Sequence, residues 1–285
     1  HAATVDVPLA SSFGVLGSRP ENIGGVRVYG FELNWNGTVW ENRRAGNALD
    51  LFVSVNGQTN EVTNTGGRTI ENLPNVIKEG QPAYAFYYKE VTGARYDASG
   101  KYLGAKESDE YHYLGKPFPD FNGAFGFDLR LLSTLTLSTK FNWAVGASVY
   151  NQSFYNVAGL GDNLKKREEL RAQLAAETVG TDAYRNVAEK LARTERNRAN
   201  YIEKADFLSI RNVTLGYTLP DETVRHLGLS RLRFYAQVNN LYTFTTYDGF
   251  DPEVAMNPDR ATYRGYDPGS MPHPRSFLFG MNLSF

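Results

Sequence analysis

Acidic and aromatic residues gather in the segment 246–274, TYDGFDPEVAMNPDRATYRGYDPGSMPHP. Its carboxylates could bind a cation or the hydroxyl groups of a substrate, and its aromatic rings could stack on sugar rings. Because Gly, Pro and Asp also form tight turns, the alternative is a loop that only packs against its neighbours. The predicted substrate-binding residues are Tyr247, Asp248, Phe250, Asp251, Glu253 and Asp267, and a wider set adds Asp259, Tyr263 and Tyr266.

Composition argues against catalysis and against a metal centre. The chain has no cysteine, and its four histidines are scattered without the spacing of zinc ligands. No acid–base pair, phosphate-binding loop or nucleophile elbow stands out. The net charge of −1 lacks the basic excess of nucleic-acid-binding proteins. We therefore predict no enzyme activity, no cofactor, no metal and no nucleic-acid partner.

Alternating apolar and polar residues mark the elements that would position this loop. In the last strand, Phe277, Phe279, Met281, Leu283 and Phe285 alternate with small or polar residues, which predicts a β-strand. Six earlier segments repeat the pattern. The seven segments cover 29–39, 49–56, 121–131, 135–149, 212–219, 232–239 and 277–285. In the first segment Val39 keeps the alternation, and in the second Phe52 breaks it.

The length of these strands and the residues on their polar side favour a membrane barrel over a soluble β-sandwich. The segments run to about 9–15 residues, whereas soluble strands cluster near 5–6 and a tilted transmembrane strand needs roughly 9–11. The polar side mixes Gly, Ser, Asn and Thr with few charges, as a barrel lumen does. We predict an all-β transmembrane antiparallel barrel, with Asp128, Arg130, Lys140, Arg233, Tyr235 and Gln237 facing the lumen.

Short and long connections alternate along the chain. Short links are expected at 40–47, 132–134 and 220–230, and long ones at 60–120, 151–205 and 246–274. This alternation predicts short periplasmic turns and long extracellular loops, with residues 1–24 on the extracellular side.

Two of the long loops have distinctive sequences. The loop 151–205 is predicted to contain two helices, 162–178 and 181–197, capped by Asp162 and Thr181. They form a solvated pair or, alternatively, a partner-binding surface. The segment 80–92 is predicted as a loop hairpin or a segment folded into the lumen.

The C-terminal third of the chain carries the motifs of a known family. YIEKADFLSIRNVTLGYTLP, LSRLRFYAQVNNLYTFTTYDGFDPEV and MPHPRSFLFGMNLSF resemble the C-terminal signature of SusC/RagA-type TonB-dependent outer-membrane transporters. ENIGGVRVYGFELNWN and YLGKPFPDFNGAFGFDL match the family more loosely. YDASGKYLGAKESDEYHYLG lacks the regular oxygen-ligand spacing of some members, so no calcium site is expected there.

The resemblance implies that residues 1–285 form the C-terminal part of a barrel of about 22 strands, without its plug and N-terminal strands. The chain opens HAATVDVPLA, which we interpret as a mature piece or a fragment. The implied function is active import of oligosaccharides or peptides through the outer membrane of a Gram-negative bacterium. A SusD-like surface lipoprotein would cover the loops, and TonB would act through the plug.

The closing strand has a further implied role. Phe277, Phe279, Met281, Leu283 and Phe285 would face outer-membrane lipid, and the terminal aromatic resembles the signal read during barrel assembly. The alternatives are a barrel that does not transport and a soluble β-sheet carbohydrate-binding module.

Overall fold

The computed structural model describes residues 2–9, 12, 14, 17–67, 69–72, 74–157, 162–195, 197–226, 228–256 and 264–285. Asp259 and Tyr263, which belong to the wider predicted set, lie outside the described residues.

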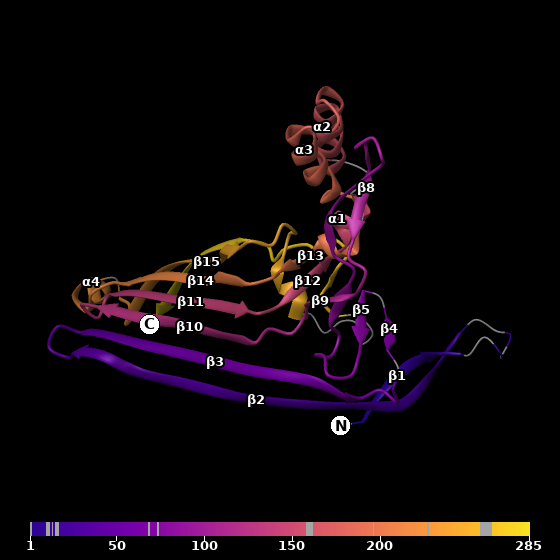
Figure 1. Cartoon of the computed structure of the whole chain (residues 1–285). Coiled ribbons are helices and arrows are strands. Elements are labelled where there is room, and N and C mark those ends of the chain that lie inside the picture. Colours follow the sequence, from indigo (N-terminus) through magenta and orange to yellow (C-terminus); the bar gives the residue numbers. More distant parts are fainter. Residues whose placement is uncertain are drawn as a thin grey trace.

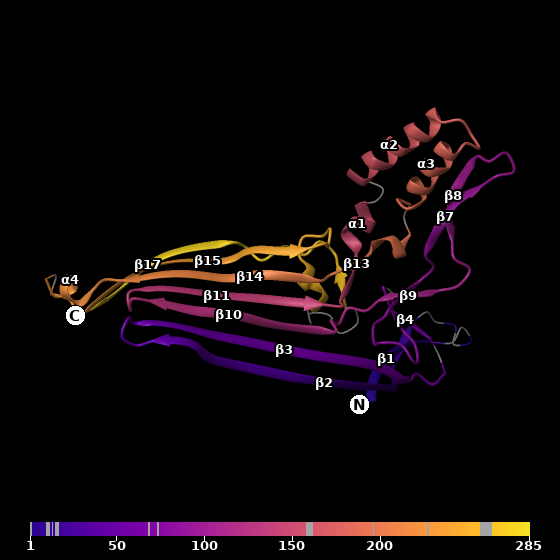
Figure 2. The same cartoon turned by 60° about the vertical axis from the view of Figure 1, so that its left-hand side comes forward.

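Eight long strands form one open antiparallel sheet, in which each strand pairs with the next sheet strand along the chain (Figures 1 and 2). Strands β1 and β17 lie at the two edges. The strands are β1 (Ala2–Pro8), β2 (Ser18–Asn42), β3 (Asn47–Asn64), β10 (Phe121–Leu131), β11 (Leu135–Val145), β14 (Phe207–Thr218), β15 (Arg231–Thr245) and β17 (Ser276–Ser284).

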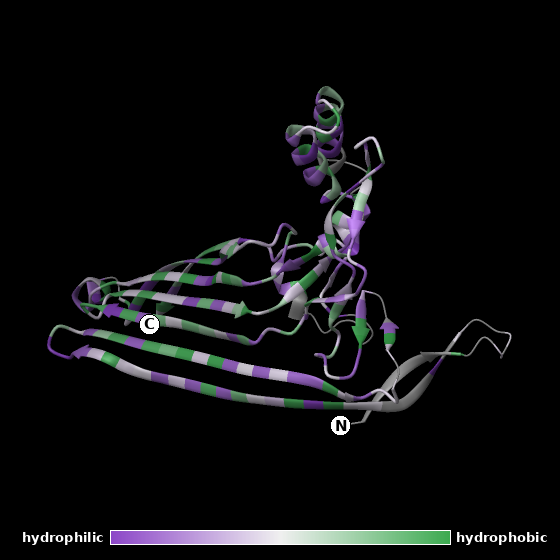
Figure 3. Ribbon diagram, in the orientation of Figure 1, coloured by the Kyte–Doolittle hydropathy of each residue, from purple (hydrophilic) through white to green (hydrophobic). Residues whose placement is uncertain are grey.

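The register of the sheet gives it one apolar face and one polar face. Leu137 lies beside Leu129 and Leu215, whereas its neighbour Ser138 lies beside Asp128 and Thr214. Side chains on paired residues point to the same side, so the apolar sets of successive strands form one continuous surface. Figure 3 shows hydrophobic and hydrophilic bands alternating along these strands. Along β15 and β17 the same surface continues through Ala236 and Phe279.

β-Bulges keep apolar residues on this face where the sequence breaks its period. In β14 the register shifts between Ile210 and Asn212, so that Arg211 occupies a bulge and the apolar residues on both sides of it stay in line. A bulge in β2 shows that the predicted position of Val39 in the alternation was wrong. The register shifts between Thr38 and Trp40, so that Trp40, and not Val39, pairs with Leu49.

The N-terminal region adds a strand that the alternation did not predict, because β1 pairs with residues 18–25 of β2 and forms an eighth strand of the sheet. This pairing lies at the end of β2 away from the short turn at 43–46. The extracellular position of residues 1–24 stays a prediction. Strand β2 begins at Ser18, well before the alternating segment that starts at Tyr29. The alternation is weak there, because the sequence is rich in polar residues and Gly. Backbone pairing extends the strand beyond the part that the pattern identified.

Strand β11 ends earlier than predicted. The alternation continues to Val149, but the strand stops at Val145 and Gly146 adopts a positive φ of 86°. Only glycine adopts this conformation readily, and its N–H donates to Asp206 Oδ1 at 2.7 Å. Val149 instead lies in β12 (Ser148–Asn151), which pairs with β13 (Ile202–Lys204) and β16 (Tyr266–Asp267) in a separate sheet.

The predicted alternation of short and long links is confirmed. Turns at 43–46 and 132–134 and the segment 219–230 join strands at one end of the sheet, shown at the left of Figure 1. The long segments leave from the opposite end. The short helix α4 (Asp221–His226) lies in the third short link.

The long segments carry small sheets of their own. The segment 80–92, predicted as a loop hairpin or a segment folded into the lumen, does not form a hairpin of its own. Its strand β6 (Phe86–Tyr88) pairs with β9 (His112–Gly115), and the following strand β7 (Val91–Tyr96) pairs with β8 (Tyr102–Glu107). Buried apolar clusters lie in these segments, one around Phe86, Tyr88, Tyr150 and Tyr201. The additional strands are β4 (Ile70–Asn72), β5 (Asn75–Ile77), β6 (Phe86–Tyr88), β7 (Val91–Tyr96), β8 (Tyr102–Glu107), β9 (His112–Gly115), β13 (Ile202–Lys204) and β16 (Tyr266–Asp267).

Helices occupy the loop after β12 as predicted. Thr181 caps α3 by accepting a hydrogen bond from the Tyr184 N–H at 3.2 Å. Both long helices end earlier than predicted, and α3 is not fully solvated because Ala188 and Ala192 are buried against β7 and β8. Across the described part of the chain, every helix is too short or too polar to span a bilayer. The helices are α1 (Gln152–Val157), α2 (Asp162–Ala176) and α3 (Asp182–Ala192), with 3-10 turns η2 (Arg198–Tyr201) and η3 (Pro252–Met256).

Candidate functional site

The six charged or polar residues predicted to face a lumen share the polar face of the sheet. Asp128 pairs with Asp50 and Ser138, and Lys140 pairs with Gly126 and Asn212. Phe52, which breaks the alternation in its segment, also lies on this face, beside Gly126. A Cβ on Gly126 would lie 2.5 Å from the Phe52 ring, so glycine makes room for it. The remaining predicted residues, Arg130, Arg233, Tyr235 and Gln237, pair with Thr136, Thr218, Gly216 and Thr214.

Side-chain hydrogen bonds run along this face, both within strand β15 and between strands. Gln237 Nε2 donates to Asn239 Oδ1 at 2.8 Å, and Asn239 Nδ2 donates to Ser276 Oγ at 3.0 Å. Arg233 Nη2 reaches Thr136 Oγ1 at 3.3 Å, and its guanidinium lies 5.8 Å from the Tyr235 ring centroid. The polar face is thus a connected hydrogen-bonding surface, able to contact a polar solute.

Two of the residues that we predicted to bind substrate, Tyr247 and Asp267, fix the fold of the segment 246–274 itself. Asp267 is 0% exposed, and its Oδ2 accepts a hydrogen bond from the Tyr247 hydroxyl at 2.7 Å. Its Oδ1 accepts from the N–H groups of Gly269 and Ser270 at 2.9 and 2.7 Å. Burial, together with the bond to this carboxylate, raises the pKa of Tyr247. The hydroxyl therefore remains a donor.

A second carboxylate fixes the start of the same segment. Glu203 Oε2 accepts from the Asp248 N–H at 3.0 Å, while its Oε1 accepts from Asn151 Nδ2 at 3.0 Å. Burial raises the pKa of Glu203, and the nearby Asp248 and Asp267 charges act in the same direction. The Asp248 side chain itself is exposed.

Glu253 pairs with Arg211, the bulge residue of β14. Arg211 Nη1 also donates to Asn240 Oδ1 at 3.0 Å, and Ser209 Oγ lies 3.4 Å from Glu253 Oε1. The turn η3 is thereby fixed to the sheet beside a cavity of about 110 Å³, which Phe250 and Asp251 also line. Phe250 is 71% exposed, and it is the aromatic residue of the predicted set that is open to a ligand.

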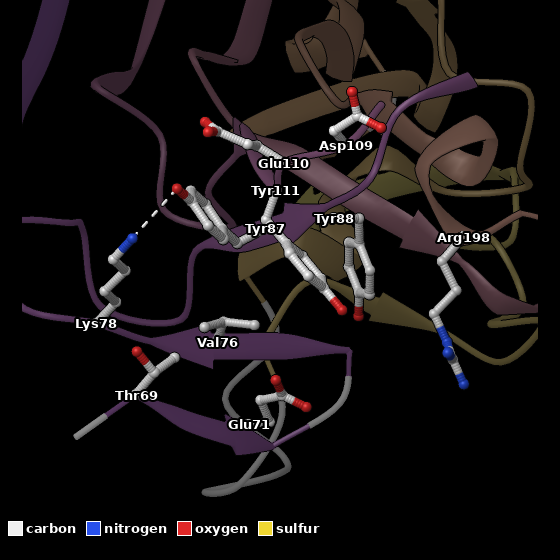
Figure 4. A pocket seen from close by; sticks show the side chains of 10 residues that line it. All are labelled: Thr69, Glu71, Val76, Lys78, Tyr87, Tyr88, Asp109, Glu110, Tyr111 and Arg198. Atoms are coloured by element: carbon white, nitrogen blue, oxygen red, sulfur yellow. Dashed lines mark hydrogen bonds between the residues drawn. The ribbon is translucent and has the colours of Figure 1, made fainter. Parts of the chain in front are cut away.

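A larger cavity lies outside the segments that were predicted to bind substrate. Its volume is about 620 Å³, and four separate segments of the chain form its walls (Figure 4). This volume falls in the range of small-molecule sites. The lining residues are Thr69, Glu71, Val76, Lys78, Tyr87, Tyr88, Asp109, Glu110, Tyr111 and Arg198.

Aromatic side chains form the rigid part of this cavity. The Tyr87 and Tyr111 rings are nearly parallel, with an interplanar angle of 6° and centroids 6.2 Å apart. Lys78 Nζ donates to the Tyr87 hydroxyl at 3.2 Å, and the buried Tyr88 hydroxyl donates to the Pro74 carbonyl. The sequence signal was the density of tyrosines and charges in YAFYYKE and SDEYHY. The pairing of β6 with β9 brings these stretches together.

The closing strand presents its predicted residues on the apolar face. Phe279 is 82% exposed, and Phe277, Met281 and Leu283 are exposed beside it. The terminal Phe285 is also exposed. In the described ranges, no three His, Cys, Asp or Glu side chains are grouped so as to hold a metal ion.

Comparisons with known proteins find that the chain is similar to parts of large receptors. No protein-family model matches it. It is 25% identical over 312 residues to TonB-dependent receptor P3 of Formosa agariphila, covering 98% of this chain and 30% of that receptor. It is also 25% identical over 317 residues to TonB-dependent receptor SusC of Bacteroides thetaiotaomicron, covering 99% and 28%. The chain therefore spans less than a third of the length of these relatives.

Solved structures show the same fold. The structure of the RagAB peptide importer in its closed-closed state matches with a TM-score of 0.74 and 22% identity, over 99% of this chain and 32% of the other. The open-open state matches with a TM-score of 0.73. The eight-stranded sheet and its outer segments thus follow the architecture of part of that importer.

Proposed function

Because the chain is related over nearly its whole length to SusC-like TonB-dependent receptors, we propose that it forms the C-terminal part of an outer-membrane import barrel. In this proposal the complete protein takes up oligosaccharides or peptides into a Gram-negative cell. A SusD-like lipoprotein delivers the substrate to the outer segments. TonB supplies the energy through a plug that the resemblance places before these strands.

The observation that carries the proposal is the continuous apolar face of the sheet. Large apolar side chains are exposed on it from β2 to β17, including Phe31 at 56% and Phe279 at 82%. Water-soluble monomers rarely expose more than a few hundred Å² of contiguous apolar surface. Hydrocarbon favours such a face, and the opposite polar face suits an aqueous lumen. Strands β10, β11 and β14, of 11, 11 and 12 residues, are long enough to cross a bilayer when tilted.

The loops at one end fit the uptake of a solute. All long segments leave the same end of the sheet, and the 620 Å³ cavity and the segment 246–274 both lie there. We assign this end to the cell exterior, with the loop 151–205 as its helical part. The relatives are named as receptors and importers, and the proposal includes no catalytic step.

Fractionation and uptake together test the proposal. We expect the protein to fractionate with the outer membrane and to need detergent, whereas recovery in the aqueous fraction would favour a carbohydrate-binding module. In intact cells, loss of the gene and inactivation of TonB should abolish uptake of the same substrate, and a plasmid copy of the gene should restore it. Unimpaired uptake without TonB would contradict active import.

A further inference from the structure

A groove opens on the apolar face of the sheet, away from the polar face that we assign to the solute. Its volume is about 620 Å³, and β2, β3, β10 and β11 contribute its walls. Phe31 of β2 pairs with Gly57 of β3, which pairs with Phe121 of β10. Phe121 in turn pairs with Val145 of β11. Cross-strand neighbours point to the same side of a sheet, so this four-residue row lies on the face that we assign to hydrocarbon.

Gly57 and the unequal reach of the strands create the hollow. A Cβ on Gly57 would lie 2.4 Å from the Phe31 ring, so the glycine lets this ring lie across β3, with its centroid 6.3 Å from that of Phe121. Strand β10 begins at Phe121, whereas β3 continues beyond that row. Figure 1 shows β2 and β3 running farther toward the long segments than β10 and β11. The groove lies at this step, because Tyr29 and Thr59, which pair in the next row on the same face, also line it.

The groove is apolar at one end and carries hydroxyl groups at the other. The side chains of the four-residue row offer only carbon atoms. Tyr29 and Thr59, toward the long segments, are exposed, and among the described residues their side chains make no hydrogen bond. Asp120 also lines this end, but its Oδ1 accepts from Lys116 Nζ at 2.5 Å. The polar end therefore offers hydroxyl groups without an unbalanced charge.

This gradient fits an acyl chain better than a polar solute. A sugar or a peptide backbone would lose its hydrogen bonds with water against the four-residue row. In the proposed barrel the row faces hydrocarbon, where an empty hollow forfeits van der Waals contacts that a chain restores. The polar end points to the side that we assign to the cell exterior, where the carbonyl end of an outer-leaflet chain lies. A hydroxyl group beside that carbonyl, as in the acyl chains of lipid A, can bond to Thr59, and the Tyr29 hydroxyl can donate to the ester.

We propose that this groove binds one hydroxylated acyl chain of lipid A, with its hydrocarbon along Phe31, Phe121 and Val145 and its hydroxyl group at Thr59. The assignment rests on the proposed outer-membrane barrel and goes beyond it. The rest of the apolar face contacts lipids that exchange freely, whereas this groove retains one lipid.

The lipid that stays with the protein tests the proposal. The protein is purified from outer membranes in detergent, and native mass spectrometry identifies the lipid that it carries. Val145→Trp fills the groove and should lower the retained lipid A about tenfold, because about ten lost atom contacts amount to this factor. Leu215→Trp places the same side chain on the exposed apolar face outside the groove and should leave the retained lipid unchanged.

Two ester probes test the role of the hydroxyl group. The methyl esters of 3-hydroxymyristic acid and of myristic acid are added to delipidated protein in detergent. The wild type should prefer the hydroxylated ester about fivefold, the value of one net hydrogen bond. Thr59→Val, which keeps the size of the side chain, should abolish this preference. Tyr29→Phe should weaken the binding of both esters alike and keep their ratio.

Other outcomes overturn the proposal. Retention of phospholipid without lipid A would reject the hydroxylated chain, and equal lipid loss in Val145→Trp and Leu215→Trp would place the lipid elsewhere on the face. A protein that co-purifies with the wild type and is lost in Val145→Trp would make the groove a protein contact.

Heat-modifiable migration on gels reports the assembly of each variant. Where Val145→Trp does not assemble, the ester preference and its loss in Thr59→Val decide the question. The need for detergent and TonB-dependent uptake in cells are measured separately, so the import barrel can stand when this lipid site fails.

Discussion

At the scale of single residues, buried polar contacts decide how the segment 246–274 is held. The Tyr247–Asp267 hydrogen bond joins the end of β15 to β16, and both side chains are buried. Asp267 has no solvent to replace a lost donor, because it is 0% exposed. Tyr247 and Asp267 were predicted to bind substrate, but this contact makes them part of the packing of the loop. It fits the alternative interpretation, in which a loop rich in turn-forming residues only packs against its neighbours.

We expect Tyr247→Phe to lower the free energy of unfolding by about 1–3 kcal/mol, because a buried carboxylate oxygen loses its donor. Thermal unfolding in detergent measures this change. Tyr242→Phe is the matched control, since Tyr242 is exposed. A direct role in substrate binding would instead appear as weaker binding with unchanged stability.

Glu203 makes the same region sensitive to pH. Burial raises its pKa above the ordinary value of 4.5, so above that pH the folded state binds more protons than the unfolded state. As far as Glu203 affects it, the free energy of unfolding is therefore highest below pH 4.5 and falls as the pH rises through the pKa of Glu203 in the folded state. We expect hydrogen exchange in 246–256 to become faster, relative to its intrinsic rate, as the pH rises from 4.5. Glu203→Gln should reduce this pH dependence; an identical profile in the variant would contradict the assignment.

At the scale of elements, glycines let bulky side chains lie across the polar face. Tyr235 in β15 covers Gly280 in β17, and a Cβ on Gly280 would lie 2.4 Å from the tyrosine ring. The pairing of the last two strands thus depends on a large residue facing a glycine. The same arrangement recurs between Phe52 and Gly126.

We expect Gly280→Ala to destabilise the β15–β17 pairing by about 1–3 kcal/mol, because the added methyl group overpacks the ring. Urea unfolding of the protein in detergent measures the change. Tyr235→Ala/Gly280→Ala should be more stable than the sum of the two single changes predicts. Strict additivity would mean that the ring and the glycine do not interact.

At the scale of the whole molecule, the apolar face and the loop-bearing end define a direction across a membrane. Hydrophobic and hydrophilic residues alternate along the long strands that Figure 3 shows in colour. Adjacent residues of β17 therefore point to different faces of the sheet. Phe279 lies on the apolar face, and Leu278 pairs with Gln237 on the polar face.

This difference gives a matched pair of substitutions. Phe279→Lys should reduce the amount of assembled outer-membrane protein, since a lysine on the lipid side costs roughly 2–4 kcal/mol near the middle of the bilayer. Leu278→Lys should be tolerated. Heat-modifiable migration on gels and quantification of outer-membrane fractions measure assembly. Equal loss for both variants would contradict the assignment of the faces.

Sequence patterns alone were sufficient to predict the all-β class, seven of the strands, the order of short and long links and the likeness to SusC-like receptors. These follow from local alternation and from motifs, which need no contact between distant segments. Even the cap at Thr181 is a local signal.

The remaining features depend on contacts between segments that lie far apart in the chain. The eighth strand forms because β2 offers a paired edge to β1, and the period-2 pattern of β11 ends where Gly146 turns toward Asp206. The cavity beside Tyr87 and Tyr111 arises because the pairing of β6 with β9 brings these two rings together. The residues that line it come from segments far apart in the chain, and no local pattern records that they meet.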